Sequence, residues 1–196
     1  MKQLNLTLVA LTVICGFYAC SNNPKQKDKN AAATDSLPGY HSDTSLKNPA
    51  DTAANTSTAF VLKAAAGGTM EVMLGNLAQQ NAQSARVKKF GAMMVKDHTK
   101  ANNELSSLAN SKSILIPSKL PDDIQDHIDK MKKFKGADFD KHYVDMMVND
   151  HKEDIDLFTK ASKDLKDSAF KSYATKTLPI LTMHLDSAKA IKKDIK

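Results

Sequence analysis

The sequence predicts an all-α fold, a bundle of four long amphipathic helices with a short extra helix between the second and the third. Apolar residues recur at helical spacing in four long stretches after residue 57. No stretch shows the alternating apolar and polar residues of a half-buried strand. Residues 58–196 are enough for one domain with a sizeable core, in which four helices bury their apolar faces against one another.

The first long helix is predicted over residues 58–80. Glu71 lies within its stripe of apolar and small residues, so this carboxylate points towards the core. Three glycines, Gly67, Gly68 and Gly75, lower the helix propensity of the same stretch. They indicate either the close approach of a neighbouring helix or, at Gly67 and Gly68, a break in the helix.

The second and third long helices, predicted over residues 84–109 and 138–165, carry two copies of one motif. MMVKDH occupies residues 93–98 and MMVNDH occupies residues 146–151. In each copy a methionine and a histidine are four residues apart, so both lie on the same face of the helix. These residues are Met94 with His98 and Met147 with His151. The aspartate before each histidine, Asp97 or Asp150, lies at the edge of that face.

A carboxylate and a further histidine complete the polar residues expected in the core. Asp154 follows His151 by one turn, whereas the matching position of the second helix holds an alanine. The fourth long helix, predicted over residues 168–195, carries His184 on the flank of its apolar stripe. Glu71 and the three histidines each lie near the middle of a helix. We therefore expect them at a similar height in the bundle, whichever way the helices run.

The second and third long helices are joined by a segment that contains the short helix. Residues 110–120 are predicted to be a loop, Pro121 opens the short helix and Gly136 ends it. Acidic residues begin this helix and basic residues end it, which matches the helix dipole at both ends. The charged residues are Asp122 and Asp123 at the start, and Lys130, Lys132 and Lys133 at the end. A short helix between two long ones suits a crossover connection.

The N-terminal stretch resembles a bacterial lipoprotein signal peptide. Lys2 precedes an apolar run over residues 4–18, and Ala19 is a small residue directly before Cys20. A transmembrane helix is the alternative, but about 20 predominantly apolar residues are needed to span a membrane, and this run is shorter. We therefore expect residues 1–20 to form a lipoprotein signal, with Cys20 as the lipidated residue and the membrane as the partner of its lipid.

Residues 21–57 are predicted to be a disordered tether, because they are polar, contain several prolines and lack apolar periodicity. No cysteine follows Cys20 in the chain, so the domain has no thiol for a disulfide or a catalytic nucleophile. The formal net charge is +6, but lysines and aspartates alternate along the helices, which is typical of solvated faces. No basic stripe interleaved with aromatic residues appears, and we expect no nucleic-acid partner.

Four segments together resemble a bacterial family of unknown function, DUF4142, described as predicted outer-membrane proteins with a ferritin-like fold. The segments are AAAGGTMEVMLGNLA, VKKFGAMMVKDHTKANNEL, FDKHYVDMMVNDH and TLPILTMHL, within residues 58–194. The resemblance implies a ferritin-like four-helix bundle with a long crossover between the second and third helices. It also implies a location in the cell envelope. Together with the lipoprotein signal, it leads us to expect a lipid anchor in the outer membrane, with the domain facing the periplasm. It implies no established activity.

The ligand set of ferritin-like carboxylate proteins is missing from this sequence. Those proteins place a glutamate on each of two helices and a Glu-x-x-His motif on each of the other two. Only Glu71 matches. Where the other glutamates would precede His98, His151 and His184 by three residues, this sequence has Val95, Val148 and Leu181. Oxygen-activating di-iron chemistry is therefore not expected.

Two interpretations of the polar residues remain. In the first, Glu71, His98, His151, Asp154 and His184 form a buried polar layer, with His98 paired to Asp154 or His151 to Glu71, and no cofactor is bound. In the second, these residues hold a Cu, Fe or Zn ion. Met94 and Met147 beside the histidines would favour Cu(I), or else they fill irregular space in the core. The sequence favours the polar layer.

The first functional hypothesis is a non-enzymatic envelope lipoprotein that acts through contacts with another protein or with the cell wall. The alternative is a periplasmic metal-binding bundle, and a third possibility is a small apolar ligand in the core. The sequence has no glycine-rich phosphate loop and no nucleophile motif, so it gives no support to a hydrolase or a transferase.

Overall fold

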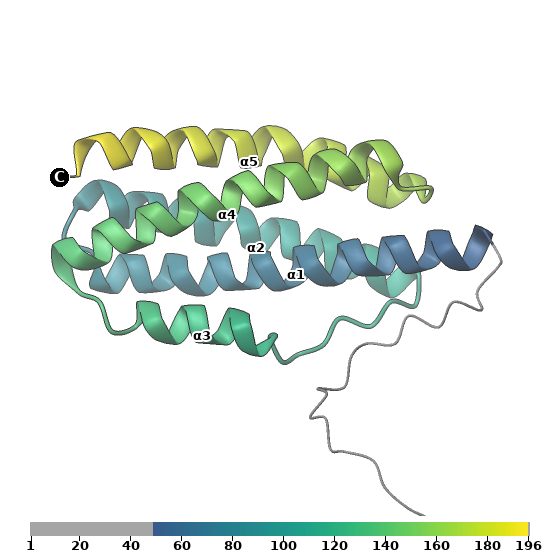
Figure 1. The fold of residues 1–196 in the computed structure, drawn as a ribbon, viewed down its shortest axis with the longest axis horizontal. Helices are drawn as coiled ribbons and strands as arrows, with labels where there is room; N and C mark the ends of the chain where they lie inside the picture. The colour runs from purple at the N-terminus through teal and green to yellow at the C-terminus, as the bar shows by residue number, and fades with distance from the viewer. Residues whose placement is uncertain (1–48, 196) are drawn as a thin grey trace, which may run out of the picture. The chain divides into compact units, whose positions relative to one another are not determined.

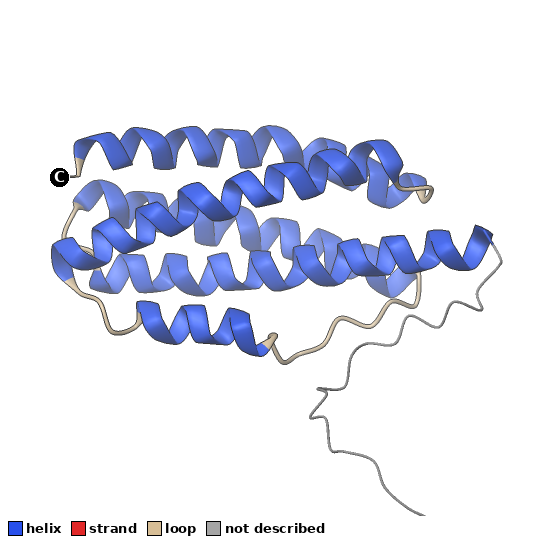
Figure 2. Ribbon diagram, in the orientation of Figure 1, coloured by secondary structure: helices blue, strands red, loops and turns tan. Residues whose placement is uncertain are grey.

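The computed structural model describes residues 49–195 of the chain. The expected signal peptide at residues 1–20, the lipidation site Cys20 and most of the expected tether lie outside this range. Residues 49–195 form five helices and no strand, apart from one isolated bridge between Ala82 and Gly136 (Figure 2). The prediction of an all-α bundle is confirmed. None of the helices in this range has an apolar stretch that could span a membrane.

Four long helices form two antiparallel hairpins (Figure 1). The helices are α1 Pro49–Asn81, α2 Ala85–Ser111, α3 Asp122–Met131, α4 Gly136–Asp164 and α5 Ser168–Asp194. α1 packs mainly on α2, and α4 packs mainly on α5. The segment over residues 112–135 runs back along the bundle, with α3 against α1, so that α2 and α4 point in the same direction. This is the long crossover connection that the sequence predicts.

Polar side chains fix the ends of the long helices. Ser84 caps α2 by accepting a hydrogen bond from the Val87 amide at 3.4 Å. Asp167 caps α5 in the same way. The carboxylate of Asp140 on α4 accepts bonds from the amides of Gln83 and Ser84, which lie between α1 and α2. One buried carboxylate therefore joins the turn of the first hairpin to the start of the second.

Two predicted boundaries are wrong. α1 begins at Pro49 rather than at residue 58, so residues 49–57 of the expected tether are helical. This stretch lacks apolar periodicity, but proline is well tolerated at the first helical position, and residues 50–57 contain no proline or glycine. Gly136 does not end the short helix, because α3 ends at Met131 and Gly136 begins α4 with φ 61°. Glycine adopts this left-handed conformation at little cost.

The glycines of α1 allow a close approach between helices. A Cβ atom added at Gly75 would lie 2.7 Å from the carbonyl oxygen of Gly91 on α2, and one added at Gly91 would lie 2.8 Å from the Gly75 oxygen. The two backbones are thus in direct contact. α1 also continues without a break through Gly67 and Gly68. The close-approach interpretation is confirmed at Gly75, and the helix break is not found.

Two apolar clusters fill the bundle. The Tyr143 cluster contains Leu74, Phe90, Met94, Tyr143, Met147 and Ile191, and the Phe158 cluster contains Phe60, Leu105, Phe158, Phe170 and Leu181. On each of the four long helices, at least one polar residue of the predicted layer lies between members of the two clusters. The polar layer therefore divides the core.

Candidate metal centre

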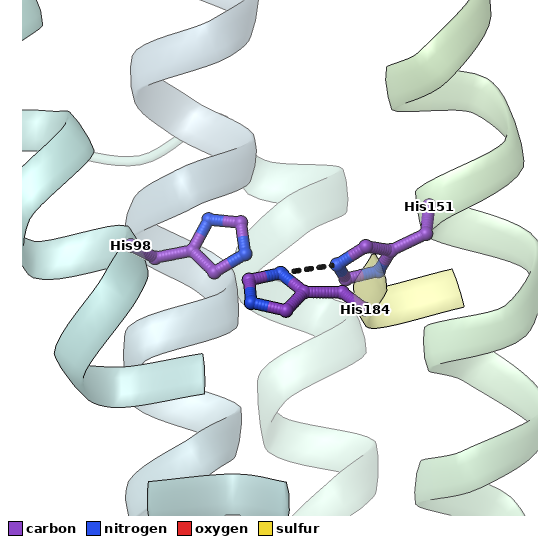
Figure 3. A group of neighbouring side chains, drawn as sticks. All are labelled: His98, His151 and His184. Carbon is purple, nitrogen blue, oxygen red and sulfur yellow. Dashed lines mark hydrogen bonds between the residues drawn. The ribbon is translucent and has the colours of Figure 1, made fainter. Parts of the chain in front are cut away.

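Three histidines from three helices meet in the layer between the apolar clusters. His98 on α2 is 6 % exposed, while His151 on α4 and His184 on α5 are fully buried. One nitrogen from each ring lies within 4.8 Å of the others, and the ring centroids are 5.1–5.6 Å apart. The rings are turned towards one another (Figure 3). The prediction that the histidines lie at one height is confirmed.

His98 is held by the glutamate of α1. Its Nδ1 lies 2.9 Å from Oε2 of Glu71, a side chain that is 1 % exposed. The predicted pairing of His98 with Asp154 is wrong, because Glu71 takes that place. With Nδ1 donating its proton to the carboxylate, Nε2 of His98 carries a lone pair. That nitrogen is buried and has no hydrogen-bond partner.

His151 is held by its own helix. Its Nδ1 lies 3.0 Å from the carbonyl oxygen of Met147, and a carbonyl can only accept, so Nδ1 is the protonated nitrogen. Oε1 of Glu71 is 3.3 Å from the same Nδ1, but the N–H points to the carbonyl and this oxygen accepts no hydrogen bond. The predicted pair of His151 with Glu71 is therefore a neighbouring contact, and Nε2 of His151 carries a lone pair.

His184 is held by the aspartate of the first motif copy. Its Nε2 lies 3.1 Å from Oδ2 of Asp97 and donates to it, which leaves the lone pair on Nδ1. This Nδ1 faces Nε2 of His151 at 3.3 Å. Two nitrogens at hydrogen-bonding distance thus both lack a proton. Each of the three imidazoles donates outward to an acceptor of the protein and turns a lone pair inward.

Burial keeps these imidazoles neutral. It lowers the pKa of His98 to about 4 and that of His151 to about 3, and for His151 the neighbouring histidines act in the same direction. The pKa of His184 is lowered as well, mainly by burial and against the effect of Asp97. The lowered pKa values disfavour, at neutral pH, the extra proton that would join the facing nitrogens of His151 and His184.

The carboxyl of Asp154 lies beside Glu71 and completes the polar layer. Burial raises the pKa of both groups well above the usual range. After burial, the charge of Asp150 raises the pKa of Glu71 further, and the charge of Glu71 raises that of Asp154. Oε2 of Glu71 remains the acceptor for the N–H of His98.

A small cavity adjoins His98 and His184. Its volume is about 20 Å³, which is room for one water-sized ligand. The polar side chains of its wall include Glu71, Asp97, His98, Asp154 and His184. An ion bound by the three lone pairs would therefore have space for one further small ligand.

The family model Domain of unknown function (DUF4142) matches residues 43–191. The chain belongs to this family. The match begins before α1 and extends into the last turns of α5, so it includes every residue of the polar layer. No curated protein and no solved structure matches the chain.

The two methionines of this DUF4142 domain lie outside the donor set. Met94 and Met147 are fully buried members of the Tyr143 cluster, and neither borders the cavity at the histidines. Met147 contributes its backbone carbonyl to His151 instead of its sulfur. The interpretation of these methionines as core residues is thus supported, and the argument for Cu(I) loses its basis.

The carboxyl group of Asp150 and the hydroxyl group of Tyr143 lie on the α4 side of the polar layer. Asp150 has a buried oxygen, Oδ2, without a hydrogen-bond partner, and burial followed by the charges of Asp154 and Glu153 raises its pKa to about 7. The hydroxyl of Tyr143 is also buried without a partner, and burial is the main reason that its pKa is raised. The aromatic ring of Tyr143 alone accounts for an apolar position, so the sequence gives no signal for this hydroxyl.

Proposed function

We propose that this DUF4142 domain binds one divalent transition-metal ion through Nε2 of His98, Nε2 of His151 and Nδ1 of His184. The proposal rests on one observation: the lone pairs of these three ring nitrogens point towards one another. His151 and His184 face each other at 3.3 Å without a proton, and Nε2 of His98 is buried without a partner. A buried polar layer that serves stability alone should satisfy such groups, and one cation would satisfy all three nitrogens together.

The surroundings of the histidines support a metal more than a structural layer. Histidines that bind metals commonly donate their other N–H to a carboxylate or a backbone carbonyl, which fixes the tautomer and the ring orientation. Glu71, the Met147 carbonyl and Asp97 fill these roles here. Three imidazoles and one small external ligand suit Zn²⁺, and imidazole also suits copper and iron.

The cellular setting of the site is proposed from the sequence. The resemblance of residues 1–20 to a lipoprotein signal supports a lipid anchor at Cys20 in the cell envelope. The family resemblance supports the outer membrane, with the domain facing the periplasm. The long crossover between α2 and α4 supports the assignment as a ferritin-like bundle. We propose a non-enzymatic role in holding or exchanging metal at the envelope, where the partner would be another envelope protein.

Metal content tests the proposal. The untagged full-length protein and its His98→Ala, His151→Ala double variant should be analysed for bound elements, before and after incubation with Cu, Zn and Fe salts. We expect about one ion per chain in the parent and none in the variant. A control variant, His127→Ala with His142→Ala, removes two histidines with exposed side chains and should retain the metal. A parent that stays empty with all three metals would leave the layer structural and return the function to protein contacts.

A further inference from the structure

An acidic groove lies between α1, α3 and α4. Five carboxyl groups are among the residues that line it, against one lysine, Lys63, and one histidine, His127. The carboxyl groups belong to Glu71, Asp123, Asp150, Glu153 and Asp154. The whole chain carries a formal net charge of +6, so this groove is a local exception to the charge of the protein.

The groove ends at the carboxyl pair that supports the histidines. Glu71 and Asp154 line both the groove and the small cavity beside His98 and His184. The pair therefore separates the groove from the cavity. A Cβ atom added at Gly67, which also lines the groove, would lie 3.7 Å from Oδ1 of Asp154. The missing side chain at Gly67 leaves the Asp154 carboxyl open to the groove.

Buried oxygens without partners line the path. Oε1 of Glu71 accepts no hydrogen bond although its side chain is only 1 % exposed. Oδ2 of Asp150 is likewise buried and without a partner. A buried acceptor that lacks a donor costs free energy, and carboxylate oxygens are ligands for divalent cations. These two atoms are therefore suited to contact a cation in transit.

We propose that this groove is the route by which a divalent cation reaches the three-histidine centre. This inference rests on the proposed function. Asp123 and Glu153, which have exposed side chains, attract the hydrated ion to the groove. Asp150 and then Glu71 replace part of its hydration shell, and the ion passes the carboxyl pair to the lone pairs of the histidines.

The rate of metal binding tests the route. Charges along a cleft raise the association rate of an oppositely charged ligand, and salt removes the effect. We would measure Co²⁺ binding by stopped-flow absorbance in the full-length protein at low and high salt. The groove variant is Asp123→Asn with Glu153→Gln. The control variant is Asp126→Asn with Asp156→Asn, which changes exposed residues of the same two helices outside the groove and alters the net charge equally.

We expect the groove variant to bind Co²⁺ about 5–10-fold more slowly than the parent at low salt, and less than about twofold more slowly in 0.5 M salt. Its dissociation rate should fall by a similar factor, because a route is used in both directions, so the equilibrium affinity changes little. The control variant should remain within about twofold of the parent. Equal slowing in both variants would assign the effect to the overall field of the protein, and no slowing in either would place the route elsewhere. Both results overturn the inference.

An uncharged obstruction gives a second test. Gly67→Leu places a side chain beside Asp154 without a change of charge, and Gly67→Ala is its matched control, since a Cβ atom fits there. We expect the leucine variant to bind and release Co²⁺ more slowly at every salt concentration, with its affinity unchanged. Unchanged rates in the leucine variant would contradict the route. A parent that never develops the Co²⁺ spectrum would instead reject the three-histidine centre, so the two failures are distinguishable.

Discussion

The two copies of the methionine and histidine motif have nearly the same sequence and different surroundings. In the copy on α2, residues 93–98, the aspartate bonds to His184 and the histidine bonds to Glu71. In the copy on α4, residues 146–151, the aspartate has a buried oxygen without a partner and the histidine bonds to its own helix. A repeated motif thus gives the same position along two helices, but the neighbouring helices decide the role of each side chain.

The difference assigns separate tasks to the two sides of the centre. The α2 side is tied to α1 and α5 by hydrogen-bonded pairs of a histidine and a carboxylate. On the α4 side, Asp150 lines the acidic groove instead. One copy therefore fixes the orientation of the histidines, and the other leaves polar groups free for an incoming ion. Substitutions on the two sides can test this division.

The largest expected difference concerns the stability of the metal-free protein. His98→Ala removes the partner of Oε2 of Glu71, whereas His151→Ala removes a ring whose N–H bonds only to the carbonyl of Met147. A buried carboxylate that loses a hydrogen bond is costly. We expect the loss in free energy of unfolding to be about 2–3 kcal/mol greater for His98→Ala, measured by urea denaturation. Glu71→Gln should restore part of the loss in the His98→Ala background. Equal losses for both histidines would show that Glu71 does not depend on His98.

The aspartates of the two copies should differ in their effect on metal affinity. Asp97→Asn weakens the acceptor that orients His184, and loss of such a partner typically lowers metal affinity about 10–100-fold. Asp150→Asn should leave the equilibrium affinity within about threefold, because Asp150 has no bond to a histidine in the polar layer. Chelator competition with Zn²⁺ measures both constants. If the two variants weakened binding alike, the division between the copies would be wrong.

The pH dependence of the free energy of unfolding should reveal the raised pKa of Asp150. Burial raises the pKa of Asp150 to about 7, so the folded protein holds this proton more tightly than the unfolded chain does. Asp150 therefore reduces stability as the pH rises from about 4 to about 7. His98 and His151, with pKa values lowered to about 4 and about 3, act oppositely, since the unfolded chain takes up their protons below about pH 6.5.

Asp150 and the two histidines change the free energy of unfolding with pH in opposite directions. The Asp150→Asn variant of the metal-free protein should therefore show a gain in stability that depends on pH. We expect a gain of about 1–2 kcal/mol at pH 8, after allowance for the partial contact of Asp150 with solvent. The gain should become small near pH 4, where Asp150 of the parent is protonated in the folded protein and about half protonated in the unfolded chain. Urea denaturation from pH 4 to pH 8 measures the curve, with Asp156→Asn as the exposed control on the same helix. A gain that is constant across this range would contradict the raised pKa of Asp150.

The sequence predicted the height of the polar residues better than their partners. The position of a residue along a helix follows from counting residues, because the rise per residue is constant, and this placed Glu71 and the three histidines in one layer. The rotation of each helix and the choice of neighbour depend on packing. The sequence therefore could not show that His98 meets Glu71 instead of Asp154.

Other features had no local signal in the sequence. The helical turns over residues 49–57 carry no apolar periodicity, so the start of α1 could not be found by that criterion. The unpaired hydroxyl of Tyr143 is visible only when the surrounding helices are in place. The inward lone pairs likewise follow from three separate hydrogen bonds on three helices, none of which the motif alone specifies.

The smallest expected effect, that of Gly67→Ala, comes from comparing the glycines by which α1 meets the two copies. Towards α2, the Gly75 backbone touches that of Gly91, two residues before the motif, so Gly75→Ala should destabilise the protein by about 1–3 kcal/mol. Towards α4, a Cβ atom at Gly67 has ordinary contact with Asp154. Gly67→Ala should therefore stabilise the protein by about 0.5–1 kcal/mol through its higher helix propensity. Thermal unfolding measures the change in stability of both variants. A loss for Gly75→Ala and a gain for Gly67→Ala would mean that α1 is in tight contact with α2 and leaves space towards α4. The proposed route for an ion on the α4 side requires this space.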